Sequence, residues 1–79
     1  MAEPVDLRGV SCPSNYVHAR LALEAVAEGD EIEVLLDAGE PVRNVPRSLK
    51  LDGDKVLALD AEGDHYRMRV QKGSGAGGW

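Results

Sequence analysis

A single cysteine, Cys12, is followed directly by Pro13, and this pair is the part of the chain best suited to chemistry. Proline is favoured at the first position of a helix, and a helical apolar pattern begins directly after it. We therefore expect Cys12 at or just before a helix N-terminus, where free N–H groups and the helix dipole stabilise an anion. A thiol in that position has a lowered pKa and raised reactivity. The alternative is that Cys12 is a small buried hydrophobic residue, as free cysteines often are.

Composition narrows the chemistry that surrounds this thiol. The chain has 79 residues, one cysteine, two histidines and a net charge of −5. A single cysteine excludes an internal disulfide and an all-cysteine zinc site, so we expect no metal and no cofactor. The acidic charge and the absence of a basic run argue against direct binding of nucleic acid. No signal peptide and no membrane-spanning apolar run is recognised, so we expect a soluble, cytoplasmic protein with a reduced thiol.

The residues after Cys12 predict a helix over 13–28. Tyr16, Ala19, Leu23 and Val26 follow helical spacing and form one core-facing stripe, whereas Leu21 lies off that stripe. Gly29 is a plausible end signal for this helix. A second, shorter helix is expected from near Arg43 or Asn44 to about Leu51, because Pro46 is tolerated only in a first helical turn. Asn44 is a candidate cap for it.

Four segments read as strands: residues 5–7, 31–37, 55–60 and 65–71. The second alternates apolar and polar residues most clearly. The last two are joined by a glycine-containing loop, residues 61–64, and form a hairpin. If strands 31–37 and 65–71 are neighbours, Glu31 and Glu33 would face Arg67 and Arg69 across the open side of the sheet.

The element order is therefore β-α-β-α-β-β. Right-handed crossovers place both helices on the same side of the sheet, which predicts an α+β two-layer sandwich with a four-stranded mixed sheet and two helices on one face. We expect one domain over residues 1–72. The glycine-rich tail 73–79 cannot bury apolar surface and is expected to be disordered.

Several short motifs, in the same order along the chain, resemble the pattern of the TusA family of sulfur carriers, also called SirA-like. The similarity covers residues 4–73. The matching residues are Leu7-Arg8-Gly9, Cys12-Pro13, Asp37, Arg43-Asn44-Val45-Pro46, and Tyr66 with Lys72-Gly73. The chain departs from the pattern at Asn15, where the family has a second proline, and at Ala38 and Gly39, where it has a second acid and a proline.

The resemblance implies that Cys12 carries sulfur as a persulfide, in a sulfurtransferase type of activity. It implies two partners: a persulfide donor, such as a cysteine desulfurase or a rhodanese-like protein, and a sulfur acceptor protein. The carrier itself would act as a monomer. Residues in a supporting or docking role would be Arg8, Pro13, Asn15, Asp37 and Arg43. The pathway stays open among tRNA thiolation, molybdenum-cofactor supply and sulfur oxidation.

Two other functions are compatible with the sequence. The first is a non-catalytic interaction or regulatory module of the same fold, in which Cys12 is incidental. The second is a carrier that uses the tail, because Gly77-Gly78 resembles the di-glycine end of ubiquitin-like sulfur carriers. That activity would require removal of Trp79 and a different fold.

Overall fold

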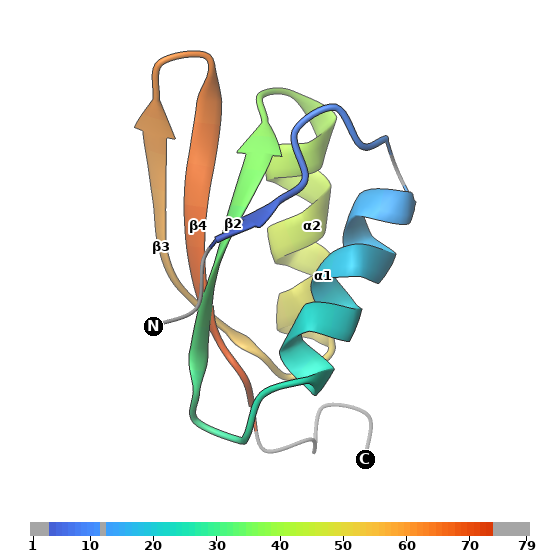
Figure 1. Ribbon diagram of the computed structural model, residues 1–79, viewed down its shortest axis with the longest axis vertical. Helices are drawn as coiled ribbons and strands as arrows, with labels where there is room; N and C mark the ends of the chain where they lie inside the picture. The colour runs from blue at the N-terminus through green and yellow to red at the C-terminus, as the bar shows by residue number, and fades with distance from the viewer. Residues whose placement is uncertain (1–3, 12, 74–79) are drawn as a thin grey trace.

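The computed structural model describes residues 4–11 and 13–73. Six elements follow in the expected order (Figure 1). They are β1 (Val5–Asp6), α1 (Ser14–Glu24), β2 (Glu31–Asp37), α2 (Glu40–Leu51), β3 (Lys55–Glu62) and β4 (His65–Gln71).

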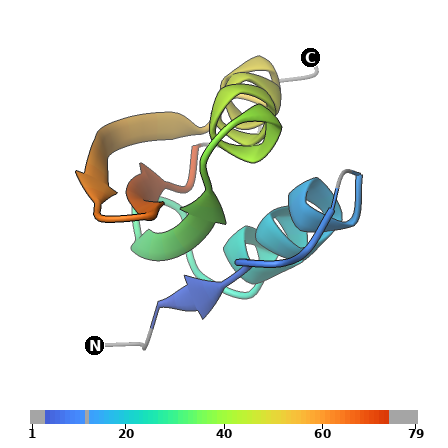
Figure 2. The same cartoon turned by 90° about the horizontal axis from the view of Figure 1, so that it is seen from above.

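The strands form one mixed sheet in the order β1-β2-β4-β3. Strand β1 runs parallel to β2, while β2 with β4 and β3 with β4 are antiparallel. Seen from above, both helices lie on the same side of the curved sheet (Figure 2). The predicted α+β two-layer arrangement, with a four-stranded mixed sheet, is therefore confirmed.

The core lies between the sheet and the two helices. The inward alternation predicted for β2 is confirmed, since Ile32, Val34 and Leu36 are all buried. On α1, Ala19 and Leu23 are buried, Tyr16 packs against the core, and Leu21 is exposed, as its position off the stripe predicts. Val26, just after the helix, also packs against the core. The buried cluster consists of Leu7, Ala19, Leu23, Ile32, Val34, Leu36, Val45, Leu49, Met68 and Val70. Neither helix in the described part of the chain has the length and apolar character needed to span a bilayer.

The boundaries of both helices differ from those predicted. Helix α1 ends at Glu24, earlier than the predicted Glu28. The chain leaves the helix at Ala25, and Gly29 instead donates from its N–H to the carbonyl of Lys72 at 3.0 Å. The sequence pattern could not reveal this bond, because it joins residues far apart in the chain.

Helix α2 begins at Glu40, so the predicted start near Arg43 and the cap at Asn44 were wrong. Gly39 takes the N-cap position with a φ of 95°, and Pro41 fills the first turn, where a proline is well tolerated. Pro46 therefore lies inside the helix and is buried. Because proline has no N–H, Pro46 donates no backbone hydrogen bond within α2.

The hairpin is also tighter than predicted. Strand β3 continues to Glu62, and only Gly63 and Asp64 connect it to β4. A two-residue hairpin turn requires residues that tolerate a positive φ, and Gly63 has a φ of 71°.

The predicted acid–base pairing on the open side of the sheet is confirmed. Glu33 accepts hydrogen bonds from Arg67 at 2.9 Å and from Arg69 at 3.3 Å. Arg67 also donates to Glu62 at 2.8 Å. The hydrogen bonds from Arg69 and Arg67 lower the pKa of Glu33, and the one from Arg67 lowers that of Glu62. At the end of β1, the hydrogen bond from the Arg8 side chain lowers the pKa of Asp6 from 3.8 to about 2.

We expect the fold to become less stable in acid, because protonation of the carboxylates removes these ion pairs. A carboxylate whose pKa is lower in the folded state stabilises the protein above its unfolded pKa, and that contribution is lost as the pH falls through the folded value. The midpoint of thermal unfolding should therefore fall as the pH drops from 4.5 towards about 2. In Arg67→Leu this decline should be shallower, because Glu33 and Glu62 lose a partner. Equal declines in the two proteins would contradict the prediction.

Candidate functional site

The loop between β1 and α1 is held in place on both sides of Cys12. Cys12 itself lies outside the described residues. Before it, the N–H of Val10 donates to the carbonyl of Leu7 at 3.1 Å, and the carbonyl of Ser11 accepts from the N–H of Asn15 at 3.0 Å. After it, the carbonyl of Pro13 accepts from the N–H of Val17 at 3.1 Å. The neighbours of Cys12 are thus joined to the first turn of α1.

Pro13 is exposed and takes the N-cap position of α1, one residue earlier than the first helical position predicted for it. Its side chain makes no capping hydrogen bond. By sequence, Cys12 comes directly before this N-cap. A thiol there would be close to the positive end of α1, which favours the thiolate. The lowered pKa of Cys12 stays a prediction.

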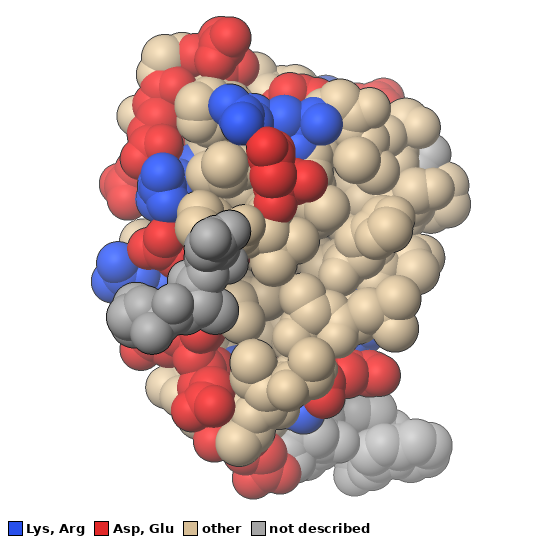
Figure 3. All heavy atoms as spheres, viewed as in Figure 1, with Lys and Arg blue, Asp and Glu red and all other residues tan. Residues whose placement is uncertain are grey.

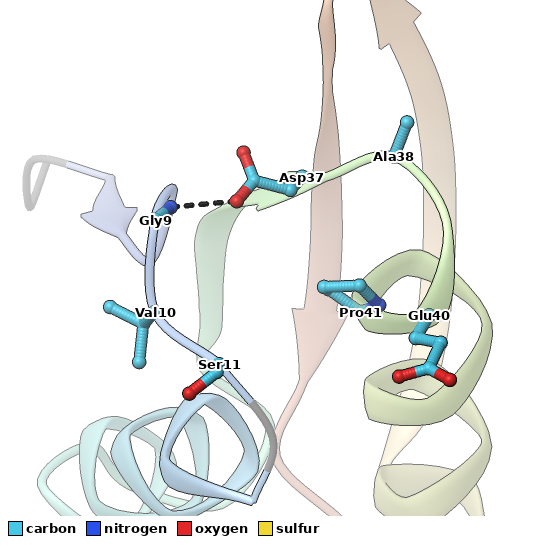
Figure 4. A pocket seen from close by; sticks show the side chains of 7 residues that line it. All are labelled: Gly9, Val10, Ser11, Asp37, Ala38, Glu40 and Pro41. Carbon is cyan, nitrogen blue, oxygen red and sulfur yellow. Dashed lines mark hydrogen bonds between the residues drawn. The ribbon is translucent and has the colours of Figure 1, made fainter.

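Asp37 connects the end of β2 to the loop. Its Oδ2 accepts a hydrogen bond from the N–H of Gly9 at 2.7 Å, between residues that are 28 positions apart (Figure 4). Gly9 has a φ of 81°, a conformation that glycine adopts without strain. The structure thus brings the acidic residue singled out from the sequence directly to the backbone three residues before Cys12.

We expect Asp37→Ala to loosen the loop. The variant removes the only acceptor that the described residues offer to the Gly9 N–H, which should lower the free energy of unfolding by about 1 kcal/mol. Hydrogen exchange at the Gly9 amide should become faster. Asp37→Asn keeps an oxygen acceptor and is the matched control. If the asparagine variant exchanges as fast as the alanine variant, the hydrogen bond is not what holds the loop.

The Arg8 side chain forms an ion pair with Asp6. Its Nε and Nη2 donate to the two carboxylate oxygens of Asp6 at 2.9 and 2.8 Å. This bidentate pair neutralises much of the positive potential that Arg8 would otherwise supply near the loop. A role of Arg8 beside the thiolate stays a prediction.

Asn15 is fully buried, with 0% of its surface exposed. Its Oδ1 accepts from the N–H of Tyr16 at 2.6 Å, which satisfies one of the free donors of the first turn of α1. No residue in 4–11 or 13–73 accepts a hydrogen bond from its Nδ2. Asn15 can therefore influence the loop from within α1 but cannot contact a partner directly. Asn15 is four residues before the buried Ala19, so the two lie on the same face of the helix, and this spacing was the available signal for its burial.

Arg43 lies on the exposed side of α2. Among the described residues, no hydrogen bond or ion pair joins it to the loop that contains Cys12. The structure therefore brings Asp37 to this loop by direct contact, while the docking role expected for Arg43 stays a prediction.

A cavity of about 290 Å³ lies beside the loop (Figure 4). One wall is the segment from Gly9 to Ser11, and the other is the connection from β2 into the first turn of α2. Sequence reasoning missed Glu40 and Pro41 as members of this site. The available signal was the acid–proline pair Glu40-Pro41. This pair directly follows Ala38 and Gly39, where the chain departs from the family pattern. The lining residues are Gly9, Val10, Ser11, Asp37, Ala38, Glu40 and Pro41.

Comparisons with known proteins agree with the fold and the motifs. The family model described as "Sulfurtransferase TusA" matches residues 3–72. A protein of Archaeoglobus fulgidus, named "Putative sulfur carrier protein", is 36% identical over 62 residues, which cover 78% of this chain and 70% of that protein. A second protein of the same name and organism is 29% identical over 68 residues, covering 86% of this chain and 93% of its own. A similarly named protein of Methanocaldococcus jannaschii is 28% identical over 68 residues, covering 86% and 91%.

The family match spans nearly the whole chain, including all six elements of the fold. The chain therefore belongs to the TusA family.

Proposed function

We propose that this protein is a sulfur carrier that holds a sulfane sulfur on Cys12 as a persulfide. The observation that supports this most strongly is the family match over residues 3–72, which includes the Cys12-Pro13 pair. A single cysteine suits the role, because no second thiol in the chain can convert the persulfide into an internal disulfide.

The proposed transfer proceeds by thiolate exchange. The Cys12 thiolate attacks the terminal sulfur of a donor persulfide, R–S–SH. A new S–S bond forms on Cys12, the S–S bond of the donor breaks, and the donor leaves as the thiolate R–S⁻. An acceptor thiolate then attacks the terminal sulfur on Cys12 in the same way and restores the Cys12 thiolate. Both steps conserve electrons, so neither an oxidant nor a reductant is required.

The proposed partners are proteins. The donor would be a cysteine desulfurase or a rhodanese-like protein, and the acceptor another sulfur-relay protein. The surface around α1 suits docking of this kind: Val17 and Leu21 are exposed apolar side chains on that helix, and the area over α1 carries few charged groups (Figure 3). We further propose that the carrier acts in the cytoplasm as a monomer. The glycines at 77 and 78, considered above for a different kind of carrier, lie outside the described residues.

The test is the intact mass of the protein after incubation with a purified protein persulfide. We expect the wild type to gain the mass of one sulfur atom, which mild reduction removes, and Cys12→Ala to gain none. A protein donor is preferable to polysulfide, which modifies exposed thiols without selectivity.

A relocated thiol provides the matched control. The double variant Ser11→Cys with Cys12→Ala keeps one cysteine but moves it by one position. It should accept sulfur from the donor several-fold more slowly, because transfer depends on thiolate character and access at one place. If the wild type stays unmodified by several donors while folded, the carrier proposal fails. A non-catalytic interaction module would then be the better description, and Cys12→Ala should bind the same partners as the wild type.

A further inference from the structure

We propose that the cavity beside the Cys12 loop binds a basic side chain, lysine or arginine, of the protein that exchanges sulfur with this carrier. This inference rests on the proposed function and names a recognition element for it. Four observations support it: the position of the cavity, the chemistry of its walls, its size and its uncompensated charge.

The position links the cavity to the sulfur. Ser11 lines the cavity, and Cys12 follows Ser11 in the chain. A side chain that enters the cavity therefore brings the rest of its own chain to the loop that contains Cys12. The first turn of α1 and the bond from Asp37 to Gly9 hold the Gly9–Ser11 wall in a defined place.

The walls combine apolar and acidic groups. Val10, Ala38 and Pro41 are the larger apolar residues among the lining, and Asp37 and Glu40 are the acidic ones. Lysine and arginine have a matching construction, with an apolar stem that packs against aliphatic groups and a cationic head. An acidic side chain would meet like charge in this cavity, and a purely aliphatic one would leave the carboxylates unpaired.

The cavity has the size that the proposal requires. Its volume of about 290 Å³ is large enough for the stem and head of one long side chain.

The negative charge of the cavity is not compensated within the described residues. One oxygen of Asp37 accepts from Gly9, but neither Asp37 nor Glu40 has an ion-pair partner in residues 4–11 and 13–73. Elsewhere in the fold, carboxylates such as Glu33 and Asp54 are paired with arginines. Arg8, the cation directly before Gly9 in the chain, is already bound by Asp6. A partner's cation would therefore supply the missing charge, which is the complementarity that guides protein association.

The experiment uses short blocked peptides that carry a cysteine as a mixed disulfide with thionitrobenzoate. Attack by the Cys12 thiolate on the peptide sulfur joins the peptide to Cys12 and releases coloured thionitrobenzoate, so the rate is read directly. The peptides differ at one position, which is lysine, arginine, norleucine or glutamate. This position is placed one, two, three or four residues from the cysteine in separate peptides. At low salt, the best lysine or arginine peptide should react about two- to fivefold faster than its norleucine counterpart, the factor that a partly exposed ion pair supplies.

Glu40→Gln should largely abolish this preference, because it removes one of the two carboxylates and keeps the shape of the side chain. Glu28→Gln is the matched control: it changes the net charge equally but follows the C-terminal end of α1, the end opposite to the Cys12 loop, and it should keep the preference. As a second measurement, blocked lysine amide should shift the backbone amide resonances of Gly9, Val10 and Ala38 in the wild type but not in Glu40→Gln. This binding does not depend on sulfur chemistry.

Equal rates for lysine and norleucine peptides would overturn the inference, as would a preference that survives in Glu40→Gln or disappears equally in Glu28→Gln. If the wild type accepts sulfur from a protein donor but shows no preference, this inference alone fails. If the amide resonances respond to lysine amide but Cys12 never accepts sulfur, the proposed function fails and the binding site remains.

Discussion

Leu23→Ala is expected to lower the free energy of unfolding by about 2–5 kcal/mol, the range measured when a buried leucine is truncated in a packed core. Leu23 has no exposed surface and packs α1 into the cluster between the helices and the sheet. A small domain has a total stability of roughly 5–15 kcal/mol, so this one change should remove a large part of it. Urea unfolding followed by circular dichroism measures the loss.

The same helix provides the control. Leu21 is two residues earlier in α1 but is 59% exposed, so Leu21→Ala should change the free energy of unfolding by no more than about 0.5 kcal/mol. Both substitutions remove the same atoms and cause the same change in intrinsic helix propensity. Similar losses in the two variants would show that burial on α1 has been assigned to the wrong face.

Asp54→Ala is expected to lower the free energy of unfolding by roughly 2–4 kcal/mol, because it removes a nearly buried carboxylate together with the hydrogen bonds that it accepts from Arg20 and from the N–H of Gly73. The side chain of Asp54 is only 4% exposed. Its Oδ2 accepts from Nη1 of Arg20 on α1 at 2.5 Å, and its Oδ1 accepts from the N–H of Gly73 at 2.9 Å. One carboxylate thus joins α1, the turn after α2 and the residue that follows β4 by two positions.

The neighbouring Asp52 allows a matched comparison. It accepts from the hydroxyl of Tyr16 and from Arg20, but a third of its side chain is exposed. Asp52→Ala should therefore cost only about 1 kcal/mol. A double-mutant cycle between Arg20→Leu and Asp54→Ala should show a coupling free energy of about 1–3 kcal/mol. A coupling near zero would mean that the loss in Asp54→Ala comes from other contacts.

Much of the fold could be predicted because it depends on local periodicity. The alternation of Ile32, Val34 and Leu36 indicates a strand with one buried face, and the spacing of Ala19 and Leu23 indicates the buried face of a helix. Both signals are geometric, since side chains repeat every two residues along a strand and every 3.6 along a helix. The element order followed from these signals, and the handedness of crossover connections led from that order to the two-layer arrangement.

The errors in the prediction arose where distant residues compete with local signals. Pro46 suggested that α2 starts late, but the helix starts at Glu40, after an N-cap at Gly39, and includes the buried Pro46. Asn15 is a different case: the resemblance implied a supporting or docking role for it, and its burial is visible only in the structure. The structure places it on the buried stripe of α1, where it bonds the N–H of Tyr16.

The candidate site shows the same division. The sequence alone predicted a reactive thiol at Cys12 and a supporting or docking role for Asp37, because residue type and motif spacing are properties of the chain. Only the tertiary structure could show that Asp37 bonds Gly9, that Glu40 and Pro41 face the same cavity, and that Asp54 joins three distant segments. These contacts link residues up to 34 positions apart, and their existence depends on how the sheet orders its strands, which no local pattern records.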